Sequence, residues 1–163
     1  MSDELLRRID RLESLEAIRT LKHLYCKHCD NGYDADAIAS LFWDDAVWDA
    51  GPGFGRYEGP DAIREFFASV SADIIWARHL VVNELIDIAG DSATGEFQII
   101  QPCTFGNGDG GDGGQAAWLL GRYEEVYARR DGIWKYLRLT AEIEFITPYE
   151  QGWHKAKSLG PAE

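Results

Sequence analysis

The chain has 163 residues, 45% of them apolar and 12% aromatic, and a formal net charge of −12 at pH 7. Its length predicts one globular domain over residues 1–163, and its acidity argues against nucleic acid or anionic membranes as partners. No apolar run reaches the ~18–20 residues that cross a bilayer.

The N-terminal part predicts amphipathic helix over residues 3–14 and 15–33, either as two helices or as one long helix. Asp30 ends this stretch, just before Asn31 and Gly32, which are good stop signals. A carboxylate at a helix C-terminus opposes the helix dipole and costs roughly 0.3–1 kcal/mol. Asp30 is therefore either an exposed turn residue or a residue kept for function.

The middle of the chain predicts a short helix, a hairpin and a second helix. The short helix covers residues 37–42, and the hairpin pairs 46–50 with 56–58 around a glycine-rich turn. Gly59-Pro60-Asp61 has the composition of a helix start and opens the helix over 62–70.

The second half predicts strands. Residues 74–77 are apolar, and longer strands are expected at 78–89, 93–105, 115–130 and 133–146, the last two joined by a tight turn. Helices followed by long antiparallel strands predict an α+β fold, with a curved sheet covered by helices on one face.

The last strand alternates between two kinds of side chain. One face combines aromatic and charged residues, and we interpret it as the interface of a homodimer or homotrimer, although an ordinary solvated face is the alternative. Its members are Trp134, Tyr136, Arg138, Thr140, Glu142 and Glu144. The other face is apolar and suits packing under the helices. Its members are Leu137, Leu139, Ala141, Ile143 and Phe145.

Metal, phosphate and nucleophile chemistry find little support. The glycine loop 106–114 lacks P-loop residues and is interpreted as a flexible hairpin loop. Cys26 and Cys29 form C-x-x-C without a second pair, so a zinc site is not expected, and no nucleophile elbow occurs. We therefore expect no metal site. Three cysteines without a framework pattern, and no signal peptide, predict a cytoplasmic protein with free thiols.

Acid–base chemistry is the remaining possibility. Among four histidines, His23 and His154 occupy polar surroundings, whereas His79 lies in the apolar stretch IIWARHLVV where the chain enters the sheet. A buried imidazole needs a partner for its ring N–H, commonly a carboxylate, and Asp30 is the candidate. Such a pair would make His79 a general base. Spacing alone leaves a purely structural histidine as the alternative.

Several motifs in order resemble the SnoaL-like branch of the nuclear transport factor 2-like superfamily over about residues 15–147. They are EAIRTLKHLYCKHCD, LFWDDAVWD, G-x-Y-x-G-P-x-A-I, the lone His79 and Y-E-x-x-Y-x-R-R-D-G-x-W-K. The pattern is similar to lindane dehydrochlorinase, scytalone dehydratase and the bile-acid 7α-dehydratases. The resemblance implies a cone-shaped barrel, with the sheet wrapped around N-terminal helices, and a tail over 148–163.

The resemblance also implies an Asp–His dyad at Asp30 and His79, and a pocket tyrosine at Tyr25. A pocket arginine of lindane dehydrochlorinase is Leu139 here, with Arg138 predicted to point to the opposite face. Scytalone dehydratase has a tyrosine where this chain has Cys29, and its additional pocket histidine has no clear match, so the leaving-group machinery does not transfer.

Together these features predict a cofactor-independent lyase or isomerase that removes a proton from an apolar cyclic small molecule. His79 would abstract the proton, Asp30 would orient His79, and Tyr25 would donate a hydrogen bond. Six apolar residues are expected to line the pocket. They are Trp43, Trp48, Trp76, Phe97, Leu137 and Leu139. The alternatives are a non-catalytic binding module or the small subunit of a ring-hydroxylating oxygenase.

Overall fold

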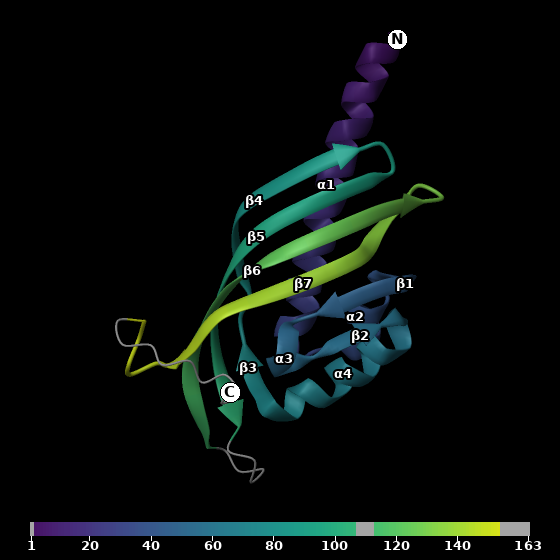
Figure 1. The fold of residues 1–163 in the computed structure, drawn as a ribbon. Helices are drawn as coiled ribbons and strands as arrows, with labels where there is room; N and C mark the ends of the chain where they lie inside the picture. Colours follow the sequence, from purple (N-terminus) through teal and green to yellow (C-terminus); the bar gives the residue numbers. More distant parts are fainter. Residues whose placement is uncertain (1, 107–112, 154–163) are drawn as a thin grey trace.

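The fold, a computed structural model that describes residues 2–106 and 113–153, begins with one long helix. Helix α1 (Asp3–Asp30) resolves the open choice between one helix and two. The Ser2 side chain caps its start by accepting a hydrogen bond from the Leu5 N–H at 3.3 Å. Its first turns project beyond the sheet, while its C-terminal half runs behind the strands (Figure 1).

The next elements form a small layer beside α1. They are α2 (Ala35–Ala39), β1 (Phe42–Asp49), α3 (Gly51–Phe54), β2 (Arg56–Glu58) and α4 (Gly59–Asp73). The predicted hairpin is confirmed, since β1 and β2 pair antiparallel, with Val47 opposite Glu58. The short helix was predicted too late in the chain, because residues 42–45 already belong to β1.

The remaining chain forms the long strands. They are β3 (Ile74–Ala77), β4 (Leu80–Ala89), β5 (Ser92–Gly106), β6 (Gly114–Arg130) and β7 (Ile133–Pro148). The sheet runs β2-β1-β7-β6-β5-β3, with β4 also paired to β5. Every pair is antiparallel except β1 with β7, which is parallel.

The strands curl around the C-terminal half of α1, and α4 closes the opening between β1 and β3 (Figure 1). Period-2 burial along β5 and β6 places one face of the sheet toward α1, where the core lies. The predicted α+β cone with a curved, mainly antiparallel sheet is confirmed.

The alternation predicted for the last strand fails at two points. At the first, between Leu120 and Gly121 of β6, Glu144 is an extra residue in β7. Phe145 therefore does not share the core face with Ile143 as predicted.

At the second point, between Val126 and Tyr127, the register of β6 against β7 shifts, so that Leu137 is an extra residue in β7. This bulge moves Trp134 and Tyr136 to the core side with Leu139, and both aromatics are buried. The outer face of β7 therefore lacks the two aromatics on which the interface argument rested, and the homodimer or homotrimer remains a prediction.

Three predictions fall wholly or largely outside the described residues: most of the glycine loop, at 107–112, the tail from residue 154 onward, and the polar setting of His154. In the described part of the chain, no helix is long and apolar enough to cross a membrane.

Candidate active site

The site begins at the C-terminal end of α1, where Asp30 meets the start of β4. The backbone N–H of His79 donates to Asp30 Oδ1 at 2.9 Å, and the Arg78 guanidinium donates to the Asp30 carbonyl at 3.0 Å. These donors offset the unfavourable position of a carboxylate at the negative end of a helix dipole. Asp30 is therefore held in place by Arg78 and His79, which follow it in the sequence by 48 and 49 positions.

The His79 ring uses the same carboxylate. Its Nδ1 lies 2.8 Å from Asp30 Oδ1, and its side chain is 6% exposed, whereas that of Asp30 is 23% exposed. An ionised carboxylate can only accept, so Nδ1 carries the proton and Nε2 keeps its lone pair. Burial lowers the pKa of His79 below its ordinary value of 6.5, and the hydrogen bond and negative charge of Asp30 oppose that shift.

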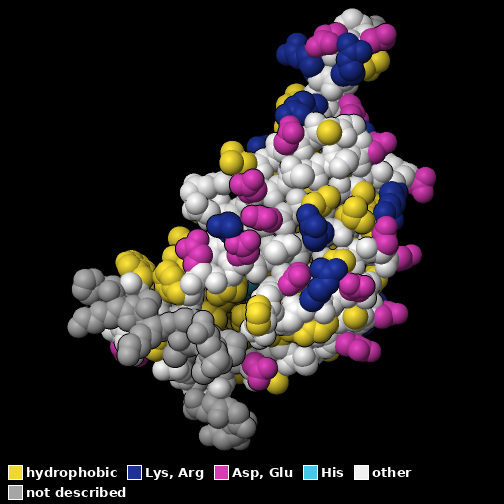
Figure 2. All heavy atoms as spheres, viewed as in Figure 1, with side chains coloured by type: hydrophobic (Ala, Val, Ile, Leu, Met, Phe, Trp, Pro, Cys, Tyr) yellow, Lys and Arg dark blue, Asp and Glu magenta, His cyan; other side chains and the backbone are white. Residues whose placement is uncertain are grey.

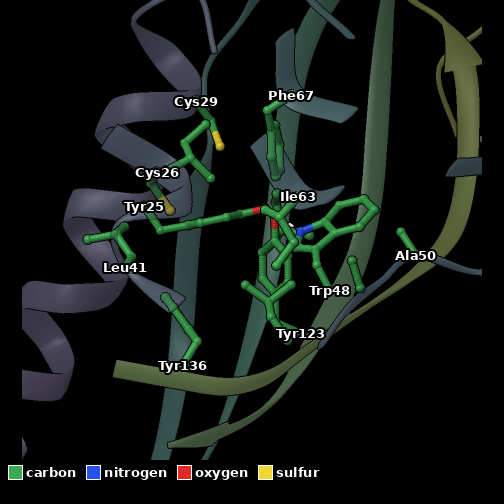
Figure 3. Packing of buried hydrophobic residues seen from close by; sticks show 14 of the residues in the cluster. Tyr25, Cys26, Cys29, Leu41, Trp48, Ala50, Ile63, Phe67, Tyr123 and Tyr136 are labelled. Carbon is green, nitrogen blue, oxygen red and sulfur yellow. Dashed lines mark hydrogen bonds between the residues drawn. The ribbon is translucent and has the colours of Figure 1, made fainter. Parts of the chain in front are cut away.

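Two phenols and an indole face this histidine across a cavity. The Trp48 Nε1–H donates to Tyr25 Oη at 3.0 Å, and the rings of Tyr25 and Tyr123 meet edge to face at 6.2 Å. The polar ends of these three side chains converge (Figure 3). Burial raises the pKa of Tyr25 and of Tyr123 well above 10, so both hydroxyls stay protonated and can donate.

The inner cavity opens into a wider groove. The cavity, of about 50 Å³, is lined by His79, Tyr25, Tyr123 and Trp48 together with apolar residues of α4 and β7. The groove, of about 1470 Å³, lies between the α3–α4 layer and β7. Seven residues line both spaces, so the cavity forms the inner end of the groove. They are Ala50, Phe54, Phe66, Val70, Ile74, Ala141 and Ile143. Apolar side chains gather where the groove opens (Figure 2).

Of the nine residues predicted for the site, the structure brings four together: His79, Asp30, Tyr25 and Trp48. Five predicted wall residues lie elsewhere, because period 2 cannot tell which part of the inner face borders a cavity. They are Trp43, Trp76, Phe97, Leu137 and Leu139.

Each of those five has a different neighbourhood. The Trp43 indole donates to the Ala128 carbonyl and lies near Arg130 and Lys135. Trp76 is 46% exposed, and Phe97 packs 5.2 Å from the Lys22 ammonium.

Leu137 is the extra residue at the bulge of β7, and Leu139 is fully buried in the core. Arg138 is exposed, as predicted from its place one residue before Leu139. The cavity therefore has no guanidinium at this point of the last strand.

Sequence reasoning missed Tyr33, Gln101 and Tyr123 in the cavity wall. Gln101 and Tyr123 lie at inward positions of β5 and β6, where a polar residue among buried neighbours was an available signal. Tyr33 had no such signal. It follows the α1 stop with a φ of +56°, a conformation that is rare for a tyrosine.

The three cysteines lie in buried positions that disfavour the thiolate. Cys26, Cys29 and Cys103 are free and buried, and burial raises the pKa of Cys26 and of Cys103 to about 11. Thiolate, the metal-binding form, is therefore disfavoured. Within residues 2–106 and 113–153, no three His, Cys, Asp or Glu side chains are placed to hold one ion.

A family model and a known relative each match most of the chain. A family model described as a SnoaL-like domain matches residues 10–140. The chain is 27% identical over 146 residues to hexachlorocyclohexane dehydrochlorinase 1 of Sphingobium indicum strain B90A, covering 86% of this chain and 88% of that protein.

Two solved structures share the fold over most of their length. One is a type 2 hexachlorocyclohexane dehydrochlorinase, with a TM-score of 0.78 and 26% identity, covering 86% of this chain and 92% of that chain. The other is the type 3 enzyme from Novosphingobium barchaimii LL02, with a TM-score of 0.76 and 26% identity, covering 86% and 93%.

Proposed function

Because the chain belongs to the SnoaL-like domain family, we propose that it is a cofactor-independent lyase or isomerase that removes a proton from an apolar cyclic small molecule. The observation that carries the proposal is the hydrogen bond between His79 Nδ1 and Asp30 Oδ1, 2.8 Å long, at the edge of a largely apolar cavity. The dehydrochlorinase relatives are lyases by name, and this supports the reaction class.

His79 is the general base. With Nδ1–H held by Asp30, the free lone pair on Nε2 accepts a proton from a substrate C–H. The lowered pKa of His79 keeps the ring neutral near pH 7. As the imidazolium forms, the Asp30 carboxylate stabilises it, because the two opposite charges are in hydrogen-bond contact and the His79 side chain is buried.

Tyr25 and Tyr123 donate hydrogen bonds to the substrate atom on which negative charge develops. The Tyr25 oxygen already accepts from Trp48, so its own O–H remains to donate to the substrate. No lysine or arginine is among the described residues that line the cavity. Neutral phenol donors suit an oxyanion such as an enolate, so we propose a substrate whose reacting C–H lies next to a carbonyl group.

The space available sets the binding mode. About 50 Å³ is far less than the roughly 300–1,000 Å³ of a typical ligand site. We therefore propose that only the reacting end enters the inner cavity, while the rest of the substrate lies in the groove between the α3–α4 layer and β7.

The test is a screen of cyclic ketones, alcohols and halides in D₂O. Deuterium incorporation reports proton removal from the ketones, and formation of the unsaturated product reports elimination from the alcohols and halides. His79→Ala should lower turnover by roughly 10²–10⁴-fold, the usual contribution of a general base. His23→Ala, which changes an exposed histidine of α1, is the matched control and should retain full activity. Unchanged turnover in His79→Ala would refute the proposal, and binding without turnover in the wild type would support a non-catalytic module.

A further inference from the structure

A second buried pair lies behind the cavity, and the proton transfer described above does not use it. Lys22 of α1 and Glu125 of β6 have fully buried side chains, with Nζ 2.6 Å from Oε1. The other Glu125 oxygen accepts a hydrogen bond from the Tyr127 hydroxyl. These two charges lie 103 residues apart in the sequence and face each other inside the cone.

Aromatic rings enclose the Lys22 ammonium. Its Nζ lies 3.2 Å from the centroid of the Tyr123 ring, 5.0 Å from that of Tyr25 and 5.2 Å from that of Phe97. Tyr25 and Tyr123 are the two phenols of the inner cavity, whereas Lys22 does not line it. The cation therefore contacts the ring faces of both proposed donors from behind.

Stability alone does not account for this pair. Replacing a buried ion pair with well-packed apolar residues is often neutral or stabilising, because both charges must lose their water. A positive charge against the face of a phenol ring, in a region of low dielectric, stabilises negative charge on or beside the phenol oxygen. It also holds the ring in one orientation.

We propose that Lys22 is a positioning residue for the site: held by Glu125, its ammonium fixes the rings of Tyr123 and Tyr25 and strengthens their hydroxyls as donors to an oxyanion in the cavity. This inference rests on the function proposed above. In agreement with it, the charge of Lys22 also contributes to the lowered pKa of His79 and so favours the neutral base.

The test removes both charges together, so that neither is left unpaired. Lys22→Met/Glu125→Leu replaces the pair with apolar side chains, and Lys22→Gln/Glu125→Gln keeps a hydrogen bond between the positions. Both variants should lower kcat by about tenfold with KM within about twofold, since weakening a donor costs less than the 10²–10³-fold of removing one. Tyr136→Phe, which removes a buried hydroxyl that has no hydrogen bond within the described residues, is the control.

A readout without turnover separates this proposal from the proposed reaction. The probe is 4-nitrophenol, whose phenolate form absorbs at longer wavelength than the phenol. Binding to the wild type and to Tyr136→Phe should lower the pH at which the probe ionises, and both double variants should reduce that shift. An equal shift in the wild type and in the folded double variants would overturn the role of Lys22. Unchanged turnover in His79→Ala would instead overturn the reaction and leave the nitrophenol result interpretable.

Discussion

Two acid–base pairs each have one member on helix α1, and they differ in what surrounds them. Asp30–His79 and Lys22–Glu125 have almost equal contact distances, 2.8 and 2.6 Å, and their α1 members are about 12 Å apart along the helix axis, at 1.5 Å per residue. His79 borders a cavity, and Asp30 is partly exposed. Lys22 and Glu125 are sealed among aromatic rings.

The comparison separates two uses of charge. A pair beside a cavity leaves one atom, here Nε2 of His79, free to react with a substrate. Such a pair lowers the free energy of unfolding, and its use is in the reaction. A sealed pair can act only through its field and its hold on neighbouring rings. Substitutions in the first pair should therefore change activity more than stability, and a single substitution in the second should do the reverse.

The largest expected effect is on folding. Lys22→Met leaves the Glu125 carboxylate buried without its partner and should lower the free energy of unfolding by about 3–5 kcal/mol. Chemical denaturation followed by tryptophan fluorescence measures this loss. Lys22→Met/Glu125→Leu is the matched control and should recover most of it. A single variant within about 1 kcal/mol of the wild type would show that the sealed pair tolerates an unpaired charge.

The next effect is on activity. Asp30→Asn keeps an oxygen that can accept the His79 N–H, so the fold should persist, but it loses the charge that stabilises the imidazolium. We expect kcat/KM to fall roughly 10²–10⁴-fold, because His79 without its charged partner loses up to the whole contribution of a general base. Steady-state kinetics measure the fall, and thermal unfolding serves as the control. If stability were lost while the specific activity of the folded protein stayed normal, the roles assigned to the two pairs would be reversed.

The smallest effect is a dependence on pH. Since burial lowers the pKa of His79 below 6.5, kcat/KM should fall about tenfold per pH unit only below that lowered value. The free energy of unfolding also depends on the protonation of His79. As pH falls below 6.5, the unfolded state binds the proton first, so the contribution of neutral His79 is complete above 6.5 and declines below it.

A pH–rate profile and denaturation curves over pH 5–8 measure both trends. His79→Gln isolates the contribution of this residue to stability, since other groups also titrate in acid. An identical pH dependence of unfolding in His79→Gln and the wild type would show that His79 is not the titrating group.

Much of this architecture could be predicted from local patterns. The apolar stripe of residues 15–33, the period-2 strands and the Asp131-Gly132 turn each depend on neighbours in the chain, and the structure contains all of them. Asp30 could be singled out because it violates a local rule at the end of its helix. Tyr123 and Gln101 carried a weaker signal, as polar residues at inward positions of their strands.

The sequence by itself determined the helices, the strands, the α+β class and the two residues, Asp30 and His79, that merited attention. Only the tertiary structure decided that their side chains meet, that a bulge at Leu137 sends Trp134 and Tyr136 into the core, and that Lys22 lies against Tyr123. The physical reason is one of range. Periodicity and capping act over a few residues, whereas a cavity depends on strand curvature and register, which are set by contacts across the whole chain.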